Sequence, residues 1–269
     1  SADARGVKIH SDESMTIGEA AFYGAGELPM GAFDWSPPVE KADLLVISAH
    51  CDDELLYFGG TIPTYAGERG LAVQVAYMAN GERLRMDEAM NGLRVCKDYN
   101  APVLVGFKDV YTETLDAAEK RWGYEETVAA IVELIRRFEP EVVVTHDLEG
   151  EYGHGAHRIT ALCTLEAVSA AADGTRYLES AEKYGAWQVK KLYLHLYDTA
   201  SITMDWRVPL AAFDGKTALD VANEAYAMHV SQQEYHQNVY DSGDYSSAEF
   251  GLAFTLVGCD LTGGDFFEN

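Results

Sequence analysis

The 269-residue sequence predicts an α/β fold with a Rossmann-like, mostly parallel sheet that helices cover on both faces. Two observations predict this fold. Residues 44–47 and 142–145 are continuous apolar runs, which is typical of strands buried on both faces of a parallel sheet. Segments with helical spacing alternate with such runs, as in strand-helix-strand units. We expect residues 41–269 to form one domain, with residues 1–40 as an N-terminal arm packed on it because Phe33 and Trp35 need apolar cover.

In the first half of the domain, each apolar run is followed by a segment of helical character. The expected elements are a strand over 44–47, a helix over 55–67, a strand over 71–79, a helix over 86–99 and a strand over 103–107. The first helix contains Gly59 and Gly60, which would let it pack closely on the sheet. No GxGxxG follows the first strand, so these glycines do not form a dinucleotide-binding loop.

In the second half, the same alternation continues to about residue 197. The expected elements are a helix over 125–138, ended by Pro140, a strand over 142–145, a helix over 157–172 and a strand over 191–197. From residue 198 the pattern changes to loops, a helix over 216–230 and a strand-like stretch over 250–257. We expect residues 198–269 to be a C-terminal extension that builds one wall of a cleft.

Composition excludes several classes of partner. The formal net charge is −24, from 44 acidic and 20 basic residues, so phosphate backbones and anionic surfaces are repelled and nucleic acid is not expected as a partner. No apolar run reaches the length of about 18 residues that a membrane span needs, and the polar start is not that of a signal peptide. The composition leaves the compartment open and favours a secreted or cell-surface location over a cytoplasmic one.

The four cysteines are far apart and form no CxxC pair. Cys96 and Cys163 lie in apolar helical patterns, where a buried free thiol is ordinary. We therefore expect reduced thiols.

Polar side chains gather where two of the predicted strands end. His50, Asp52, Asp53 and Glu54 follow the first strand, and a run with three histidines, at 146, 154 and 157, follows the strand over 142–145. The carboxyl ends of parallel strands are where ligands bind in such sheets. His50 and Asp53 are three residues apart, so across one helical turn their side chains can converge on one metal ion. A solvated helix N-terminus would explain the carboxylates but not the histidine beside them.

One His, one Asp and a second His with an open position are the usual plan for catalytic zinc. His154 and His157, three residues apart at the start of a helix, can reach the same pocket in different roles. Iron, cobalt or another divalent transition metal could occupy the same ligands, because affinity alone does not decide metal identity.

At these residues the chain resembles the PIG-L/LmbE-like family of zinc-dependent N-deacetylases, whose first motif reads AHPDDE and whose second ends in HxxH. The segment 50–54, HCDDE, matches the first motif and the segment 152–157, YGHGAH, matches the second. The resemblance implies that His50, Asp53 and His157 bind zinc and that Asp52 is the general base. It also implies that His154 assists at the oxyanion or the leaving group, with Tyr152 as a further oxyanion donor.

The sequence departs from the family pattern at two places. Cys51 replaces the proline of the first motif, and Gly155-Ala156 stand where Pro-Asp is common. Neither departure removes an expected ligand. We expect the thiol of Cys51 to point away from the metal, because a thiolate there could occupy the open catalytic position.

The resemblance also implies an N-acetylglucosamine-containing glycoside, or a related amino-sugar conjugate, as the substrate. Arg85, Asp109 and His229 match family elements, and they are candidate substrate contacts or groups close to the pocket. Each of these residues also has a purely structural interpretation: Arg85 could pair with Glu88, Asp109 could cap a turn, and His229 could cap a helix C-terminus.

Three other functions are open from the sequence. One is a non-catalytic carbohydrate-binding domain, although such a domain has no need of Asp52 beside the metal. Another is a metal-dependent amidase that acts on non-sugar N-acyl substrates. A two-metal phosphoesterase would need more ligands than this set offers, and the net charge of −24 disfavours phosphate substrates.

Overall fold

The computed structural model describes residues 35–269 except 82 and 110, together with residues 8, 10, 22, 24 and 26. Contacts divide the chain into two units, 1–34 and 35–269, and the second unit carries the α/β fold. Most of the expected N-terminal arm lies outside the described residues, so its packing on the domain stays a prediction. In the second unit, Trp35 is partly buried against the apolar core.

Within residues 35–269, seven strands form one sheet in the order β3-β2-β1-β4-β5-β7-β6. Their bounds are Leu44–Ser48 (β1), Val73–Asn80 (β2), Val103–Lys108 (β3), Val142–Thr145 (β4), Lys191–His195 (β5), Ser201–Thr203 (β6) and Glu249–Thr255 (β7). The strands from β1 to β5 are parallel, and β7 runs antiparallel to both β5 and β6. The chain builds outward from β1 to β3 and then returns to place β4 beside β1. This reversal creates the crevice in which such sheets bind ligands.

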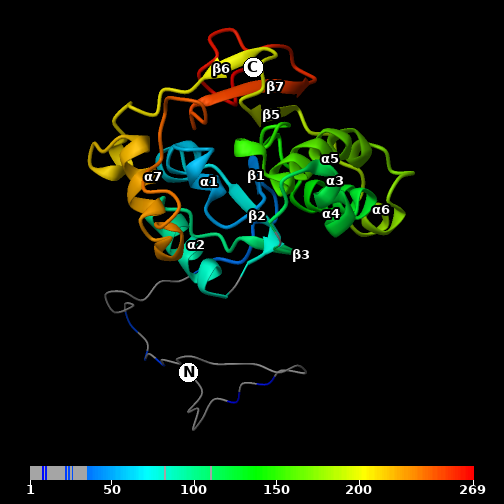
Figure 1. Ribbon diagram of the computed structural model, residues 1–269, viewed down its shortest axis with the longest axis horizontal. Coiled ribbons are helices and arrows are strands. Elements are labelled where there is room, and N and C mark those ends of the chain that lie inside the picture. The colour runs from blue at the N-terminus through cyan, green and yellow to red at the C-terminus, as the bar shows by residue number, and fades with distance from the viewer. Residues whose placement is uncertain are drawn as a thin grey trace. The chain divides into compact units, whose positions relative to one another are not determined.

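Helices cover both faces of the sheet (Figure 1). On one side lie Asp53–Leu56 (α1), Arg83–Val95 (α2) and Ala218–Tyr226 (α7); on the other lie Leu115–Trp122 (α3), Tyr124–Phe138 (α4), Gly155–Ala172 (α5) and Leu178–Tyr184 (α6). Alternate residues of β1 serve the two cores, since Leu44 and Val46 belong to one and Leu45 and Ile47 to the other. The predicted fold class is confirmed.

The helix expected over 55–67 is wrong as a single element. It consists of α1, a stretch of turns and the π-helical segment Pro63–Glu68 (η1). Gly59 has a φ of +49°, and a Cβ on Gly60 would lie 2.6 Å from Cβ of Ala218 and 2.7 Å from Trp206. The two glycines therefore admit Trp206 and α7, rather than the sheet as we expected.

The C-terminal third extends the sheet through β6 and β7. A buried lysine ties this extension to the parallel part, because the ammonium of Lys191 in β5 donates to Asp260, to the hydroxyl of Tyr193 and to the carbonyl of Glu268. The helix expected over 216–230 ends at Tyr226, and a short 3₁₀ helix, Val230–Gln232 (η4), follows it.

Two further findings concern the cysteines and the membrane. All four cysteines are free, and Cys259 alone among them is exposed. None of the described helices has both the length and the apolar character needed to cross a bilayer.

Candidate active site

A cavity of about 400 Å³ opens where β1 and β4 end. We call its more buried lining residues the inner wall: His50, Asp52, Asp53, Leu56, Tyr57, Arg85, Asp109 and His154. The remaining, more exposed lining residues form the outer wall: Tyr111, Tyr152, Gln232, Tyr235 and His236. Residues from the C-terminal extension thus form part of one wall of this cleft.

The first motif turns sharply between β1 and α1. Asp52 has a φ of 131° and a ψ of −29°, a conformation that residues other than glycine rarely adopt and that costs about 1–3 kcal/mol. The carboxylate of Asp53 folds back to accept the backbone N–H of His50 at 2.8 Å, and Glu54 accepts the N–H of Asp52 at the same distance. The turn therefore fixes Asp53 beside His50 and directs Asp52 elsewhere.

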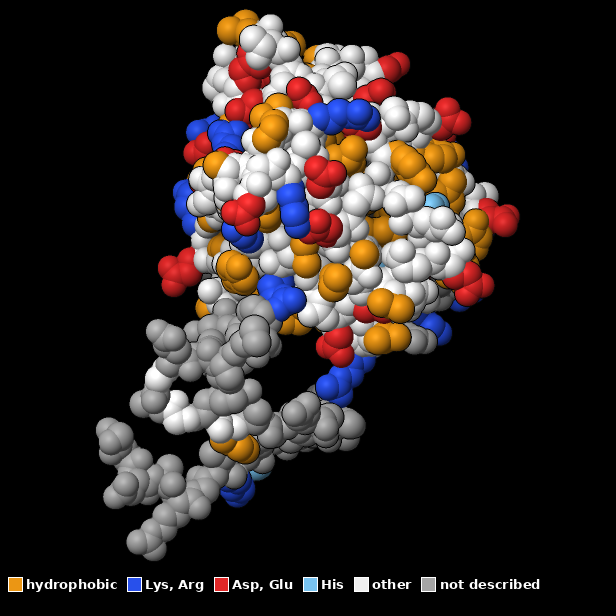
Figure 2. Space-filling model, turned by 90° about the vertical axis from the view of Figure 1, so that its left-hand side faces the viewer, with side chains coloured by type: hydrophobic (Ala, Val, Ile, Leu, Met, Phe, Trp, Pro, Cys, Tyr) orange, Lys and Arg blue, Asp and Glu red, His pale blue; other side chains and the backbone are white. Residues whose placement is uncertain are grey.

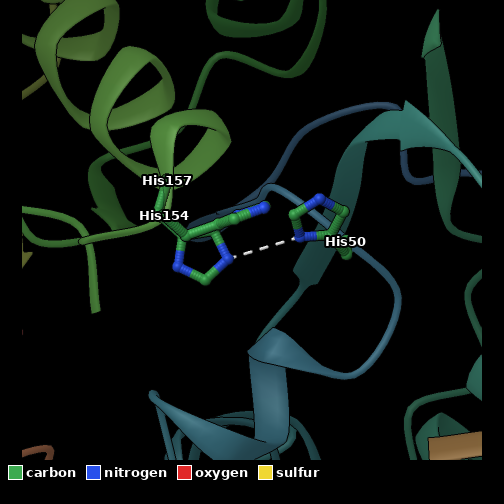
Figure 3. A group of neighbouring side chains, drawn as sticks. All are labelled: His50, His154 and His157. Atoms are coloured by element: carbon green, nitrogen blue, oxygen red, sulfur yellow. Dashed lines mark hydrogen bonds between the residues drawn. The ribbon is translucent and has the colours of Figure 1, made fainter. Parts of the chain in front are cut away.

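Three ligand atoms of His50, Asp53 and His157 form a compact triangle. Nδ1 of His50 lies 3.1 Å from Oδ2 of Asp53 and 3.3 Å from Nε2 of His157, and the Asp53–His157 edge is 3.3 Å. Figure 3 shows His50 facing the start of α5, from which His154 and His157 project. In a tetrahedral zinc site with bonds of about 2.05 Å, the ligand atoms are about 3.3 Å apart. The triangle fits a zinc-sized cation.

The charge distribution at this triangle suits a cation as well. Burial raises the pKa of Asp53, but His157 and His50 outweigh burial and bring that pKa well below its ordinary value. Burial lowers the pKa of His157, but Asp53 and Glu151 outweigh it and raise the pKa to about 10. Both shifts arise because negatively charged Asp53 and positively charged His157 stabilise each other.

His146 lies close to the same triangle, since its Nε2 is 3.5 Å from Oδ2 of Asp53. Two other groups of side chains that could hold a metal share residues with the triangle: Asp53, His146 and His157, and His50, His154 and His157. However, Nε2 of His146 accepts the backbone N–H of Ala49 at 2.8 Å, so its lone pair is already engaged. This contact favours His50 over His146 as the partner of Asp53 and His157.

His154 stands beside the triangle as a neutral ring. Burial, together with the imidazoles of His157 and His50, lowers the pKa of His154 to about 3. Its Nδ1 is buried without a hydrogen-bond partner. The hydroxyl-bearing ring of Tyr152 lies 5.7 Å from the His154 ring and is partly exposed in the cavity.

Asp52 turns toward Arg85 rather than toward the triangle. Arg85 Nη2 donates to Oδ1 of Asp52 and to the carbonyl of Cys51, both at 2.7 Å, and Nη1 lies 3.3 Å from Oδ2 of Asp109. Burial and the charge of Asp53 raise the pKa of Asp52 well above its ordinary value, although Arg85 opposes the rise. The two adjacent carboxyls are thus driven in opposite directions, which is how paired acids take different roles.

The purely structural interpretation of Arg85 is wrong, because Glu88 accepts the N–H and hydroxyl of Ser231 instead. Asp109 lines the cavity and also approaches His50, with Oδ1 at 3.6 Å from Nε2.

His229 does not line the described cavity. It is fully buried, with Nε2 at 3.7 Å from Oε1 of Glu54 and its ring stacked on Tyr226. The interpretation of His229 as a direct substrate contact therefore needs correction. The physical reason is that α7 ends at Tyr226, and the turn after it directs His229 into the core.

The thiol of Cys51 packs in the apolar core and belongs to neither group of possible metal ligands. Burial, with the charge of Glu54, raises the pKa of this thiol far above its ordinary value, so it stays protonated. This arrangement agrees with the expected direction of the side chain.

The sequence interpretation assigned no role to Glu151, His146 or His195. Glu151 lies in the 3₁₀ helix Glu151–Gly153 (η2) and is fully buried. Its carboxylate accepts from the Nδ1 atoms of His157, His146 and His195 at 2.7, 3.0 and 2.6 Å. One signal was available, since His195 ends an apolar run at the carboxyl end of a third parallel strand, as His50 and His146 do.

Residues 45–168 match the PIG-L family, described as GlcNAc-PI de-N-acetylase. The 1D-myo-inositol 2-acetamido-2-deoxy-alpha-D-glucopyranoside deacetylase of Rhodococcus jostii is 30% identical over 241 residues, covering 70% of this chain and 81% of that protein.

Two solved structures share the fold at low identity. The N,N'-diacetylchitobiose deacetylase of Pyrococcus horikoshii has a TM-score of 0.56 and 19% identity over 74% of each chain. The 4-carboxy-2-hydroxymuconate hydratase of Pseudomonas putida has a TM-score of 0.51 and 18% identity, covering 83% of this chain and 100% of that one. Because one of these proteins is a hydratase, the fold by itself does not decide the reaction.

Proposed function

The chain belongs to the PIG-L family and is an N-deacetylase, and from this premise we propose that it removes the acetyl group from an N-acetylglucosamine unit in a small neutral glycoside, with a divalent cation at His50, Asp53 and His157. Zinc is the cation we propose first. The observation that carries the proposal is the triangle of ligand atoms with edges of 3.1, 3.3 and 3.3 Å beside a second, separately held carboxylate.

The cation supplies Lewis acidity toward the amide carbonyl and makes a neighbouring water more acidic. His50, Asp53 and His157 would hold it, and the cavity that His50 and Asp53 line would admit the substrate. Asp52 receives the proton of the attacking water, because its carboxylate is held beside the triangle without belonging to it. Its raised pKa suits a group that accepts a proton and then passes it to the leaving amine.

His154 and Tyr152 stabilise the oxygen on which negative charge develops. His154 is a neutral ring that lines the cavity, so the ring nitrogen that carries hydrogen can donate to the substrate carbonyl if it faces the cavity. Tyr152 carries a hydroxyl whose pKa burial and the charge of Asp53 raise far above its ordinary value, so it remains a donor. The rings of these two residues are 5.7 Å apart.

Asp109 and Arg85 orient the sugar. Asp109 is partly exposed in the cavity and can accept from sugar hydroxyls, and Arg85 holds it in place. Arg85 is also the one lysine or arginine among the described lining residues, and Asp52 and Asp109 already engage it. A phosphorylated aglycone would meet acidic groups without a free cation, so a neutral aglycone is favoured.

The test measures acetate release by the zinc-loaded protein from three kinds of substrate. We expect N,N'-diacetylchitobiose and N-acetylglucosaminyl-inositol to be deacetylated faster than a phosphorylated N-acetylglucosaminyl-inositol, and faster than N-acetyl amino acids. Asp109→Ala should lower turnover of the glycosides more than it lowers metal binding. Equal or faster turnover of N-acetyl amino acids would remove the sugar from the proposal, and preference for the phosphorylated glycoside would remove the neutral aglycone.

A further inference from the structure

Glu151 is the centre of a buried cluster that includes three histidines from three separate elements. His146 follows β4, His157 lies in the first turn of α5, and His195 ends β5. All four side chains are fully buried, and every histidine directs Nδ1 at the one carboxylate. A carboxylate of this kind is costly to bury, and an apolar side chain would fill the same space without that cost.

The hydrogen bonds determine which ring nitrogen carries the proton. An ionised carboxylate only accepts, so a ring nitrogen bonded to it carries hydrogen. His146 supports this assignment independently, because its Nε2 accepts the N–H of Ala49 and its proton must therefore be on Nδ1. When His157 is neutral, as a metal ligand must be, the same tautomer leaves the lone pair on Nε2 free, and that nitrogen lies 3.3 Å from both Oδ2 of Asp53 and Nδ1 of His50.

Glu151 also connects the loop before α5 to the sheet. Oε1 accepts from His195, whose Nε2 lies 2.9 Å from the carbonyl of Ser246 just before β7. Between the carboxylate and α5 the chain passes through Tyr152 with a φ of +51° and Gly153 with a φ of +83°. Because the Glu151 side chain is held from β4 and β5, the short segment that carries Tyr152 and His154 starts from a fixed point.

We propose that Glu151 is a positioning residue, which presents Nε2 of His157 to the cation and anchors the loop that carries Tyr152 and His154, while His146 and His195 hold the carboxylate in place. This inference rests on the cation site of the proposed function. Carboxylate partners of this kind orient a ligating histidine and raise its basicity, and their loss typically weakens metal binding about 10–100-fold.

The experiment measures the zinc dissociation constant of the 269-residue chain by competition with a chelator. We expect Glu151→Ala to weaken zinc binding about 10–100-fold. Glu151→Gln should restore most of this affinity, to within about tenfold of wild type, because its amide oxygen can still accept from His157 and His146 and its NH₂ group can donate to Nδ1 of His195. A purely space-filling role would not distinguish the two variants in this way.

The matched control is Glu149→Gln. Glu149 lies on the same loop but is exposed and bonds to Arg158, so its loss should leave zinc affinity unchanged. If Glu151→Ala does not fold, His195→Phe carries the test, because it keeps a ring beside Phe58 and Phe250 but removes the bond to the carboxylate. Zinc affinity should then fall at least about threefold. Wild-type affinity in Glu151→Ala, or in His195→Phe where that variant is needed, would overturn the inference.

Deacetylation is measured separately with wild-type protein. If wild type binds zinc but releases no acetate, while Glu151→Ala still loses zinc affinity, the proposed function fails and the positioning role stands. If wild type deacetylates the glycosides and Glu151→Ala keeps its zinc affinity, the positioning role fails and the proposed function stands.

Discussion

The inner and outer walls of the cavity are built on different physical principles. On the inner wall, His50, Asp52, Asp53 and His154 are buried at strand ends or helix starts, and hydrogen bonds or ion pairs hold the two aspartates in opposite directions. On the outer wall, Tyr111 and Tyr235 are 63% and 72% exposed. The adjacent acids and the ligand triangle are therefore held by burial and bonding, whereas Tyr111 and Tyr235 are exposed rings that a substrate can cover.

The protein surface carries apolar side chains as well as charged ones. Figure 2 shows one face of the molecule, on which hydrophobic side chains gather beside a histidine while acidic and basic side chains are scattered elsewhere. The ring of Tyr152 lies 6.4 Å from that of His236, but only 5.6 Å from His157 and 5.7 Å from His154, so this residue connects the outer wall to the bonded network. Substitution of Tyr235, which is 72% exposed, should leave the inner wall intact.

The largest effect is expected when either of the two adjacent acids of the inner wall, Asp52 or Asp53, is substituted. Asp52→Asn should keep the metal and reduce kcat about 10²–10⁴-fold, because it removes the proton acceptor and leaves the triangle untouched. Asp53→Ala should lose the metal itself. Metal analysis of the purified variants and initial rates of acetate release together measure both effects. Full metal content in Asp53→Ala would show that the ligand assignment is wrong, and a near wild-type rate in Asp52→Asn would place the base elsewhere.

A smaller effect is expected on the outer wall. Tyr235→Ala should raise KM for a neutral disaccharide about fivefold with little change in kcat, because shielding roughly 40 Å² of apolar surface contributes about 1 kcal/mol. KM and kcat for N-acetylglucosamine itself serve as the control, since a single sugar that fills the inner wall gains less from this ring. A fall in kcat of the same size would instead link Tyr235 to the chemistry, and the division between the walls would not hold.

The smallest effect is expected at Cys51. Its thiol packs in the apolar core while its carbonyl accepts from Arg85, so Cys51→Ala should leave zinc affinity and kcat within about twofold of wild type. Thermal unfolding should show a modest loss of stability from the missing sulfur atom. A large change in zinc affinity would mean that the thiol reaches the cation.

Local spacing explains how much of this architecture is predictable from sequence. The continuous runs before His50 and His146 identify β1 and β4, and the regular apolar spacing over 125–138 identifies α4. The shorter elements α3, α6 and β6 were not predicted. The three residues of β6 are too few to show any period, and α3 and α6 are short helices with many charged residues.

The residues of the site also differ in how far the sequence predicts their positions. His50 and Asp53 are close in sequence, so their spacing already indicates that they could bind the same metal ion. Glu151 and His195 are 44 residues apart, and the intervening chain contains several residues with positive φ angles. No local pattern encodes the contact between them. His229 was a candidate because it matches a family element, and that match does not show that the side chain is fully buried beside Glu54 rather than exposed in the cavity.

Lys191 has a consequence for how the protein is made. Its ammonium lies buried in β5, and two of its partners, Asp260 and the carbonyl of Glu268, come from residues that leave the ribosome about 70 positions later. Until those residues emerge, a completed sheet would enclose an unpaired charge, which costs several kcal/mol. We therefore expect the sheet to close around Lys191 only after residues 260–268 are available, and we expect a chain that ends before residue 260 to be less stable and more sensitive to proteases.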